Sequence, residues 1–559
     1  MLKKQEERPA TKEKIQEYKR FIIKEQMCIR RYHIGKRGNM SVIAKNPIMP
    51  GFYPDPSMCA VGEDFYLVNS TFAYFPGLPI LHSKDLVHFE QIGNVMDRES
   101  QLPLGDTGHS RGLFAPTIRY YNGTFYVICT NVSHGGNYIV TATSPEGPWS
   151  EPYYLEGADG IDPSLFFDED GTCYYIGTHP NPAGCKYDGD WYIWIQQVDL
   201  ENMKLVGPKK DVWNGAMRDV IWPEGPHLYR KDGYYYIMHA EGGTGPDHAV
   251  SVCRSKDIWG PYENYKKNPV LTHRHLGLDY PIKYVGHSDI VETVNGEWYM
   301  VMLAVRPLER YTTMGRETFL AKVTWEEGWP VVNPGIGMLT DEVEINLPEW
   351  IPENDPTSYT SRTGAFTAVP GSNRCYDFAA MEKLGHEFLM LRNPREDMYR
   401  LTDKGIELKL SPITMKENET SSYVAIRQQH HNFTVKATVC AGALIGKESA
   451  GLAYMQNNDY NLRLEVFAGE AKAILCQGGQ DEIIGSVAVS GDEQQLAIVV
   501  EGLTTRLLVN GQEIATAGVS ALSTEVAGGF VGCTAGIYAS GNGEDNGNYV
   551  CFKSLGYEA

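Results

Sequence analysis

Residues 222–237 read WPEGPHLYRKDGYYYI. The first part of this stretch holds one acid, Glu224, between a tryptophan, two prolines and a glycine, where the backbone has little freedom. The second part is an Asp-Gly turn followed by an aromatic strand, which is a strong signal for a β-hairpin. The stretch therefore predicts that the Glu224 carboxylate is held in a fixed direction, on the strand that precedes a hairpin turn.

The hairpin part of this stretch occurs five times between residues 45 and 347. The five copies read GEDFYLV (62–68), NGTFYV (122–127), DGTCYY (170–175), DGYYYI (232–237) and NGEWYM (295–300). The spacing is similar from copy to copy, and the tyrosines that align are Tyr66, Tyr126, Tyr174, Tyr236 and Tyr299. Strand–turn–strand repeats of this length are typical of propeller blades, so five units predict an all-β fold with a five-bladed β-propeller.

Unusual residues recur at one position of this repeat. Asp55, Asp162 and Glu224 each precede the shared tyrosine of their own unit by almost the same interval, and Phe114 and His287 stand at the equivalent place in the other two units. The innermost strand of each propeller blade lines the central axis, so one position repeated in every blade forms a ring around it. We therefore expect the three carboxylates to meet in one pocket.

The rest of the chain divides into two further parts. Residues 1–44 are rich in Lys, Arg, Glu and Gln, which predicts a flexible basic extension before the propeller of residues 45–347. After the cluster of prolines near residue 350, short polar–apolar alternations such as FTVKATV (433–439) and YNLRLEV (460–466) follow. These are typical of half-buried antiparallel strands and predict a β-sandwich domain over residues 355–559.

Composition limits the function. The 559-residue chain has a net charge of -20, which argues against nucleic acid as a partner because phosphate binding needs a basic face. It has 11 cysteines with no Cys-x-x-Cys pair, no apolar stretch long enough for a membrane, and no signal-peptide core, so we expect a cytoplasmic protein with reduced thiols. No zinc-type spacing, phosphate-binding glycine loop or Gly-x-Ser-x-Gly elbow is found.

Carboxylates that meet in one pocket suit glycoside hydrolysis, in which one carboxyl group protonates the leaving oxygen and another attacks the sugar or activates water. Glu224 is the candidate acid, because Trp222 and the flanking prolines are expected to desolvate it and raise its pKa. Asp55 is the candidate base, and Asp162 is expected to tune Glu224. An isolated Asp-Pro is usually a turn or cap, and a single histidine such as His287 is usually part of the core; only the shared repeat position favours the catalytic interpretation.

Several short motifs in order carry a resemblance to a known family. They are NPI (46–48), GFYPDPS (51–57), STF (70–72), FPG (75–77), IDPS (161–164), WPEGP (222–226) and GRET (315–318). Residues 45–559 resemble glycoside hydrolase family 43, of the β-xylosidase and α-L-arabinofuranosidase type with a C-terminal jelly-roll or concanavalin-like β-sandwich. The resemblance implies a five-bladed propeller and an inverting mechanism.

The resemblance also implies residue roles. Asp55 would be the general base, Glu224 the general acid, and Asp162 the group that modulates the pKa of Glu224 and orients it. Phe72 would pack at the rim of the sugar pocket, and Arg316 would hydrogen-bond substrate hydroxyls. His287 would lie on the axis and face a water or a structural calcium ion, which makes it a candidate metal ligand; no other cofactor is expected.

Two departures from the family pattern concern the pocket. Phe114 stands where many relatives carry Trp, and residues 529–536, GFVGCTAG, offer no clear match for the aromatic that reaches the pocket from the sandwich. The resemblance implies an exo-acting β-xylosidase on xylo-oligosaccharides, and these departures leave α-L-arabinofuranosidase or a bifunctional enzyme open as the alternative. A non-catalytic sugar-binding propeller is the alternative from another class. The expected partner is a small oligosaccharide, without nucleic acid or membrane; a homo-oligomer is compatible with the sequence.

Overall fold

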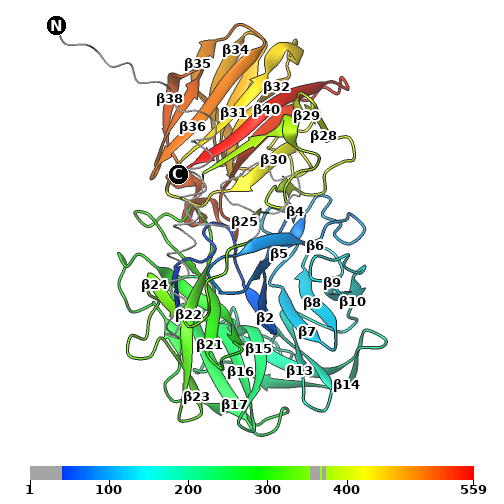
Figure 1. The fold of residues 1–559 in the computed structure, drawn as a ribbon, viewed down its shortest axis with the longest axis vertical. Helices are drawn as coiled ribbons and strands as arrows, with labels where there is room; N and C mark the ends of the chain where they lie inside the picture. The colour runs from blue at the N-terminus through cyan, green and yellow to red at the C-terminus, as the bar shows by residue number, and fades with distance from the viewer. Residues whose placement is uncertain (1–40, 353–365, 368–372) are drawn as a thin grey trace, which may run out of the picture.

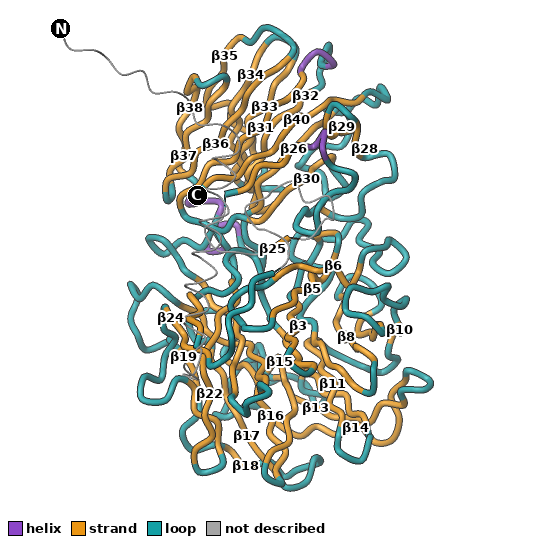
Figure 2. The backbone as a smooth tube through the Cα atoms, in the orientation of Figure 1, coloured by secondary structure: helices purple, strands orange, loops and turns teal. Residues whose placement is uncertain are grey.

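The computed structural model describes residues 41–352, 366–367 and 373–559. Within these residues the chain forms two β-rich lobes that are stacked along the long axis of the molecule (Figure 1). Strands dominate both lobes (Figure 2). Helical turns are confined in the described part to η1 (Phe378–Ala380), η2 (Ala441–Ala443), η3 (Ser520–Leu522) and α2 (Thr524–Ala527). None of these is long and apolar enough to cross a membrane.

The first lobe contains five antiparallel sheets of four or five strands, each made mainly of strands that follow one another in the chain. The first sheet comprises β2 (Ser57–Val61), β3 (Asp64–Val68), β5 (Gly77–Ser83) and β6 (Glu90–Met96), with β25 (Phe366–Thr367) at its edge beside β6. The second comprises β7 (Thr117–Tyr121), β8 (Thr124–Asn131), β9 (Gly136–Ala142) and β10 (Tyr153–Tyr154). The third comprises β11 (Ile161–Phe167), β12 (Cys173–Pro180), β13 (Trp191–Asp199) and β14 (Lys204–Trp213).

The last two sheets of this lobe follow the same plan. The fourth comprises β15 (Glu224–Lys231), β16 (Tyr234–Glu241), β17 (Ala249–Ser255), β18 (Glu263–Asn264) and β19 (Leu271–Thr272). The fifth comprises β20 (Lys283–Glu292), β21 (Trp298–Val305), β22 (Glu317–Glu326) and β23 (Trp329–Val332). The five predicted turns join the first and second strands of the five sheets, so the predicted hairpins are confirmed.

The first strands of the five sheets pack against one another. Contacts run from β2 to β7, on to β11, β15 and β20, and back to β2. The first strands therefore surround the centre of the lobe, and each one contacts the first strands of two other sheets. The repeated position picked out in the sequence lies on or directly before these five strands.

Strand β1 (Val42–Lys45) pairs with β24 (Glu342–Ile345), which comes from the other end of the same lobe's sequence. In the described part the first strand therefore begins at Val42, ahead of the predicted boundary at residue 45. The reason is that its residues find hydrogen-bonding partners far along the chain, which sequence periodicity alone does not reveal. The rest of the predicted extension, residues 1–40, lies outside the described residues.

The second lobe is a β-sandwich of two antiparallel sheets. One contains β28 (Tyr399–Thr402), β29 (Gly405–Lys409), β40 (Tyr549–Glu558), β31 (Asn432–Cys440), β36 (Glu493–Glu501), β37 (Thr504–Val509) and β38 (Gln512–Gly518), with β26 (Arg374–Asp377) beside β40. The other contains β30 (Ser422–Arg427), β39 (Thr534–Ser540), β32 (Ser449–Asn457), β33 (Tyr460–Phe467), β34 (Glu470–Gln477) and β35 (Gln480–Ala488). The predicted sandwich is confirmed.

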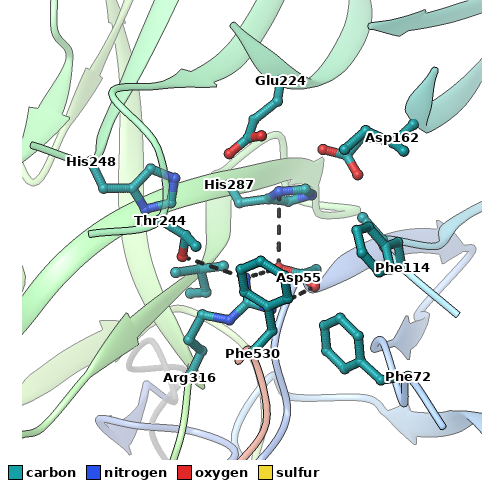
Figure 3. Close-up of a pocket in the computed structure, with 13 residues that line it drawn as sticks. Asp55, Phe72, Phe114, Asp162, Glu224, Thr244, His248, His287, Arg316 and Phe530 are labelled. Atoms are coloured by element: carbon teal, nitrogen blue, oxygen red, sulfur yellow. Dashed lines mark hydrogen bonds and ion pairs between the residues drawn. The ribbon is translucent and has the colours of Figure 1, made fainter. Parts of the chain in front are cut away.

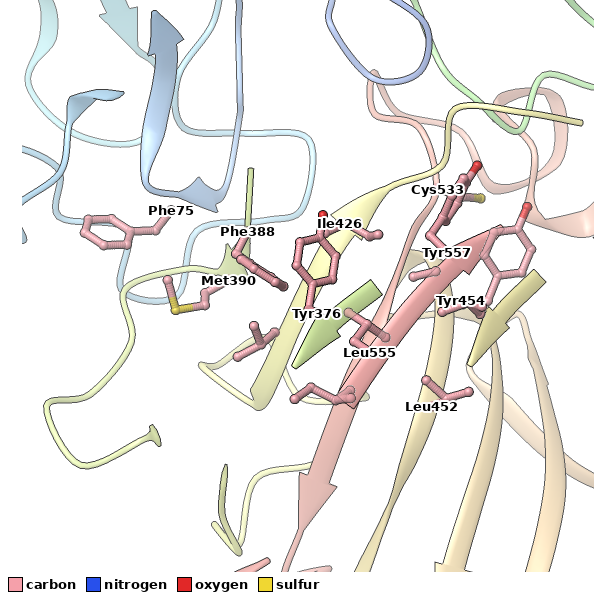
Figure 4. Packing of buried hydrophobic residues seen from close by; sticks show 14 of the residues in the cluster. Phe75, Tyr376, Phe388, Met390, Ile426, Leu452, Tyr454, Cys533, Leu555 and Tyr557 are labelled. Carbon is pink, nitrogen blue, oxygen red and sulfur yellow. The ribbon is translucent and has the colours of Figure 1, made fainter. Parts of the chain in front are cut away.

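The two lobes are held together by strand pairing and by a shared apolar core. Strand β27 (Met390–Leu391) pairs with β4 (Tyr74–Phe75), and β25 (Phe366–Thr367) pairs with β6. Met390 and Phe75 are direct partners, and Figure 4 shows them side by side next to Phe388. Burying side chains of this size contributes about 2 kcal/mol each, so the sandwich is positioned firmly over the first lobe.

Candidate active site

All seven side chains predicted to form a site lie in one pocket of about 90 Å³ (Figure 3). The residues that line it are Asp55, Phe72, Phe114, Ala115, Ile161, Asp162, Glu224, Thr244, His248, His287, Leu303, Arg316 and Phe530. Pockets for drug-sized ligands are about 300–1,000 Å³. The present one is therefore suited to a single small sugar ring.

Asp55 is held by two partners. The hydroxyl of Ser70 donates to its Oδ2 at 2.5 Å, and the guanidinium of Arg316 contacts both carboxylate oxygens at 2.8 and 3.3 Å. Such a forked pair fixes the carboxylate plane as well as its position. The imidazole Nδ1 of His287 lies 4.0 Å from Oδ1. Asp55 is thus oriented from several sides and only 4% exposed.

Glu224 and Asp162 point into the pocket from the side opposite Phe72 and Arg316 (Figure 3). Burial, the negative charge of Asp162 and that of Asp55 raise the pKa of Glu224 well above its usual value. Within the described residues no side chain or backbone group hydrogen-bonds the carboxyl group of Glu224, so its proton can be offered to a ligand. Burial is also the main cause that raises the pKa of Asp162 to about 6, and the backbone amide of Gly225 donates to it at 3.2 Å.

Local irregularities of the first strands aim these side chains. The pairing register shifts at Asp162 in β11, at Glu224 in β15 and at His287 in β20. Asp55, Asp162 and His287 also have positive φ angles of 51°, 54° and 48°. Bulges and left-handed residues redirect side chains at a cost of order 1–3 kcal/mol each, and such strain is concentrated at functional sites.

The glycine of the WPEGP motif, Gly225, lies against the ring of His287. Its φ is +55°, and a Cβ atom there would lie 2.8–3.0 Å from three ring atoms of His287. Any side chain at this position would push the imidazole away from β15. The motif therefore positions His287 as well as Glu224.

One detail of the predicted desolvation is wrong. Trp222 does not line the pocket; its ring packs instead against Gly189 and Gly243. Trp222 itself has a positive φ of 45°, which the proline after it in the sequence did not reveal. The pKa of Glu224 is raised by burial among the other pocket residues and by two carboxylates.

Three phenylalanines form the apolar wall. Phe72 stacks on Phe530 with ring centroids 5.9 Å apart, and Phe114 meets both rings edge to face, at 5.4 and 5.9 Å. The guanidinium of Arg316 lies 5.7 Å from the Phe72 ring and 5.5 Å from that of Phe530. Phe72 and Phe114 were predicted. Phe530 corrects the expectation that residues 529–536 carry no aromatic matching the pocket position.

The loop that carries Phe530 is hydrogen-bonded to two segments of the first lobe. The Phe530 amide donates a hydrogen bond to the Ser110 hydroxyl at 2.9 Å, and the Cys533 amide donates one to the Thr313 carbonyl at 2.7 Å. A Cβ atom at Gly315 would lie 2.6 Å from the backbone nitrogen of Gly532, so two glycines permit this approach. The sandwich thereby completes one side of the pocket.

Two polar pocket residues, Thr244 and His248, were not predicted from the sequence. They lie between the second and third strands of the fourth sheet, and Phe72 and Arg316 lie at the equivalent place in the first and fifth sheets. These connections differ in length from sheet to sheet, so no constant interval in the repeat marks the residues. His248 donates its Nδ1 hydrogen to the Tyr284 carbonyl at 2.9 Å, which leaves Nε2 as an acceptor without a hydrogen-bonding partner in the described protein.

A buried polar network below the pocket ties the first strands together. Its centre is the carboxylate of Asp289 on β20, which binds Arg119 on β7, Ser57 on β2 and Tyr229 on β15 at 2.7, 2.6 and 2.6 Å. On β11, Ser164 joins through the ring of His227 at 3.1 Å. Burial alone would raise the pKa of Asp289, but Arg119 and His227 hold it well below its usual value. The first strands of all five sheets are thus joined by hydrogen bonds, and the bond between Arg119 and Asp289 is charge-assisted.

The pocket does not fit a protein-bound calcium ion. Among residues 41–352, 366–367 and 373–559, no group of three or more His, Cys, Asp or Glu side chains is placed to hold a metal. Calcium prefers six to eight oxygen ligands, whereas His287 presents nitrogen and its neighbour Asp55 is already bound to Ser70 and Arg316. No step of the chemistry below depends on a metal.

Comparisons with known proteins agree with both lobes. Residues 44–330 match Glycosyl hydrolases family 43, and residues 375–558 match the Beta xylosidase C-terminal Concanavalin A-like domain. A "Xylosidase/arabinosidase" of Butyrivibrio fibrisolvens is 51% identical over 526 residues, which cover 92% of this chain and 98% of that one. A "Non-reducing end alpha-L-arabinofuranosidase" of Bacteroides ovatus is 36% identical over 91% of this chain and 93% of its own length. The solved xylan beta-1,4-xylosidase of Bacillus halodurans superposes with a TM-score of 0.83 at 32% identity, over 92% of this chain and 100% of that one.

Proposed function

The chain belongs to glycosyl hydrolases family 43 and is a glycosidase, and from this premise we propose that it removes single terminal pentoses from short plant-type oligosaccharides with inversion. Release of β-linked xylose is the first activity, and release of α-L-arabinofuranose by the same pocket is the second. The observation that carries the proposal is the meeting of Asp55, Asp162 and Glu224 in one small pocket.

Each carboxyl group has a distinct role in this proposal. Glu224, whose pKa is raised, donates its proton to the leaving oxygen. Asp55 accepts a proton from the attacking water on the other face of the sugar, as an inverting mechanism requires. Asp162 keeps Glu224 protonated through its negative charge and, bound to the amide of Gly225, stays beside it.

The arrangement of the first lobe is a five-bladed β-propeller in this proposal. The consecutive order of strands in each sheet and the closed ring of contacts among the first strands support it. In a propeller the pocket lies at one end of the axis, with a residue from each blade around it. The domain limits follow from this division, with the propeller up to about residue 347 and the sandwich after it.

The pocket wall accounts for the two sugars. Phe72, Phe114 and Phe530 offer apolar faces, while Arg316 and the free Nε2 of His248 can bind hydroxyl groups. A pentopyranose and a pentofuranose have similar sizes, so a wall of this kind discriminates weakly between them. The names of the two relatives above cover both activities, which supports the pairing.

The proposal is tested with a panel of 4-nitrophenyl glycosides, namely β-D-xylopyranoside, α-L-arabinofuranoside and a hexoside control, each with and without chelator. We expect hydrolysis of both pentosides, no hexoside hydrolysis, and no effect of the chelator. NMR of the first product formed from xylobiose is expected to show α-xylose. Binding of xylobiose without turnover would favour the non-catalytic alternative, and a β-configured first product would contradict inversion.

Asp162→Asn is expected to move the alkaline limb of the kcat/KM–pH profile down by about one pH unit, because the charge that helps to keep Glu224 protonated is lost while its burial remains. The pH dependence is measured on 4-nitrophenyl β-xyloside. Asp168→Asn is the matched control, since Asp168 is a buried carboxylate after β11 that pairs with Arg230 outside the pocket. An unchanged or raised alkaline limb in Asp162→Asn would contradict the modulating role.

Phe530→Ala is expected to lower kcat/KM on short xylosides by about ten-fold, since an aromatic contact is worth about 0.5–1.5 kcal/mol beyond its buried area. The loss should appear mainly in KM, because the carboxylates are untouched. Val526→Ala, in the exposed helix α2 of the same segment, is the control and should change kcat/KM less than two-fold. Equal rates for both variants would mean that the sandwich contributes nothing to binding.

A further inference from the structure

The outer face of the sandwich carries a pair of directly opposed cysteines. Cys440 at the end of β31 is the pairing partner of Cys551 on β40. On the outer sides, Glu407 on β29 is opposite Cys551, and Glu493 on β36 is opposite Cys440. Because directly opposed residues of antiparallel strands project to the same face, the four side chains form one row.

This pair differs from most other cysteines of the described chain. Six cysteines are buried, whereas Cys440 and Cys551 are both half-exposed. They line a cavity of about 720 Å³, which also contains the side chains of Asp377, Asp403, Glu407, Asp492, Lys404 and Lys553. A small molecule can therefore reach both sulfur atoms at once.

The backbone geometry suits a covalent bridge. Opposed residues in antiparallel strands have Cα atoms about 4.5–5.5 Å apart, and disulfides need about 4.4–6.8 Å. The thiol of Cys551 donates to the Lys404 carbonyl at 3.6 Å, and Cys440 is near enough to help raise the pKa of Cys551. A bond between the two sulfur atoms would therefore join residues that are already pairing partners.

We propose that Cys440 and Cys551 form a thiol–disulfide exchange site, which closes to a cross-strand disulfide on reaction with a low-molecular-weight disulfide of neutral or positive charge. The thiolate of Cys440 attacks one sulfur of the reagent RSSR, giving a mixed disulfide and one RSH. The thiolate of Cys551 then attacks the Cys440 sulfur and expels the second RSH. In sum, two protein thiols are oxidised, one RSSR is reduced, and the two thiol protons end on two RSH molecules.

The surroundings of the pair affect the rate of these steps. Burial and the neighbouring Cys440 raise the pKa of Cys551 to about 12, so Cys551 is held as a thiol at neutral pH. Exchange should therefore be slow at neutral pH and accelerate as pH rises. Four carboxylates and two lysines line the cavity, which disfavours anionic reagents such as oxidised glutathione.

The bridge would tie down the last strand of the chain. Strand β40 pairs with β26, β29 and β31 near the middle of the larger sheet. A disulfide from β40 to β31 closes a long loop and restricts the unfolded chain, which raises the thermal midpoint of the sandwich by roughly 5–10 °C. Neither β31 nor β40 contributes a residue to the active-site pocket, so the proposal does not rest on the glycosidase activity.

The test treats the full chain with cystamine, which is dicationic, or with oxidised glutathione, at pH 8 and low salt. We expect cystamine to remove two thiols, to leave a disulfide-linked peptide containing Cys440 and Cys551, and to raise the thermal midpoint. Glutathione should react about ten-fold more slowly, with the difference shrinking in about 1 M salt. Reduction with dithiothreitol should reverse every change.

The variants Cys440→Ser and Cys551→Ser should each lose the linked peptide and the shift in thermal midpoint, while keeping hydrolytic activity as evidence of folding. Cys185→Ser and Cys375→Ser are the controls, because these two cysteines are exposed and have no such partner in the described chain. They should retain the linked peptide. Mixed adducts at Cys185 and Cys375 without any Cys440–Cys551 linkage would overturn the proposal.

Discussion

Glu224→Gln is expected to lower kcat/KM on xylobiose by about 10³-fold, yet to cost less than about ten-fold on 2,4-dinitrophenyl β-xyloside. The physical reason is the leaving group. A sugar oxygen must receive a proton as its bond breaks, whereas dinitrophenolate leaves unaided. Glutamine keeps the shape of the side chain and removes the acid whose pKa is raised by burial and by Asp162.

Steady-state rates on the two substrates distinguish an acid from a merely structural residue. Glu241→Gln is the matched control, because Glu241 is also buried, lies on the neighbouring strand β16 and binds His239 and Ser251 away from the pocket. It should leave the ratio of the two rates unchanged. An equal loss on both substrates after Glu224→Gln would remove Glu224 from the acid role.

Asp55→Asn is expected to lower kcat by about 10³–10⁴-fold on both substrates, because water must be activated whatever the leaving group is. KM should change little, since the amide keeps the volume of the carboxylate. The same two substrates provide the measurement, so the pair of variants gives two different patterns. Together they assign one acid to the leaving group and the other to the water.

The control for Asp55 is Asp64→Asn, a change of the same type on β3 of the same sheet, where the carboxylate binds His82 at the surface. Activity there should stay within two-fold. Thermal unfolding of Asp55→Asn should be recorded as well, because Arg316 loses its carboxylate partner. Full activity in a folded Asp55→Asn protein would contradict the catalytic interpretation as a whole.

Much of the first lobe could be predicted because its information is local. An Asn-Gly or Asp-Gly turn and the aromatic strand after it specify a hairpin from near neighbours in the sequence. Five such hairpins in order specify five sheets. In three of the units an acid precedes the shared tyrosine by a nearly constant interval, so the three acids lie at equivalent places in their sheets. Asp55, Asp162 and Glu224 were therefore found together, without knowledge of any contact between sheets.

Other pocket residues depend on contacts that leave no local pattern. His248 and Thr244 come from a connection between later strands of one sheet, whose length varies from sheet to sheet. Trp222 seemed the natural neighbour of Glu224, but its indole packs against Gly189 and Gly243 instead. Residues adjacent in sequence were in these cases poor guides to what surrounds a side chain.

The amino-acid sequence by itself determined the hairpins, the sandwich strands and the three carboxylates, because turn residues and strand alternation act over a few neighbours. Only the tertiary structure decided how those acids behave. The raised pKa of Glu224 comes from burial and from two carboxylates on other sheets, and the pocket is closed by Phe530 from the opposite lobe. Burial and charge act through space, so they are settled only when distant strands meet.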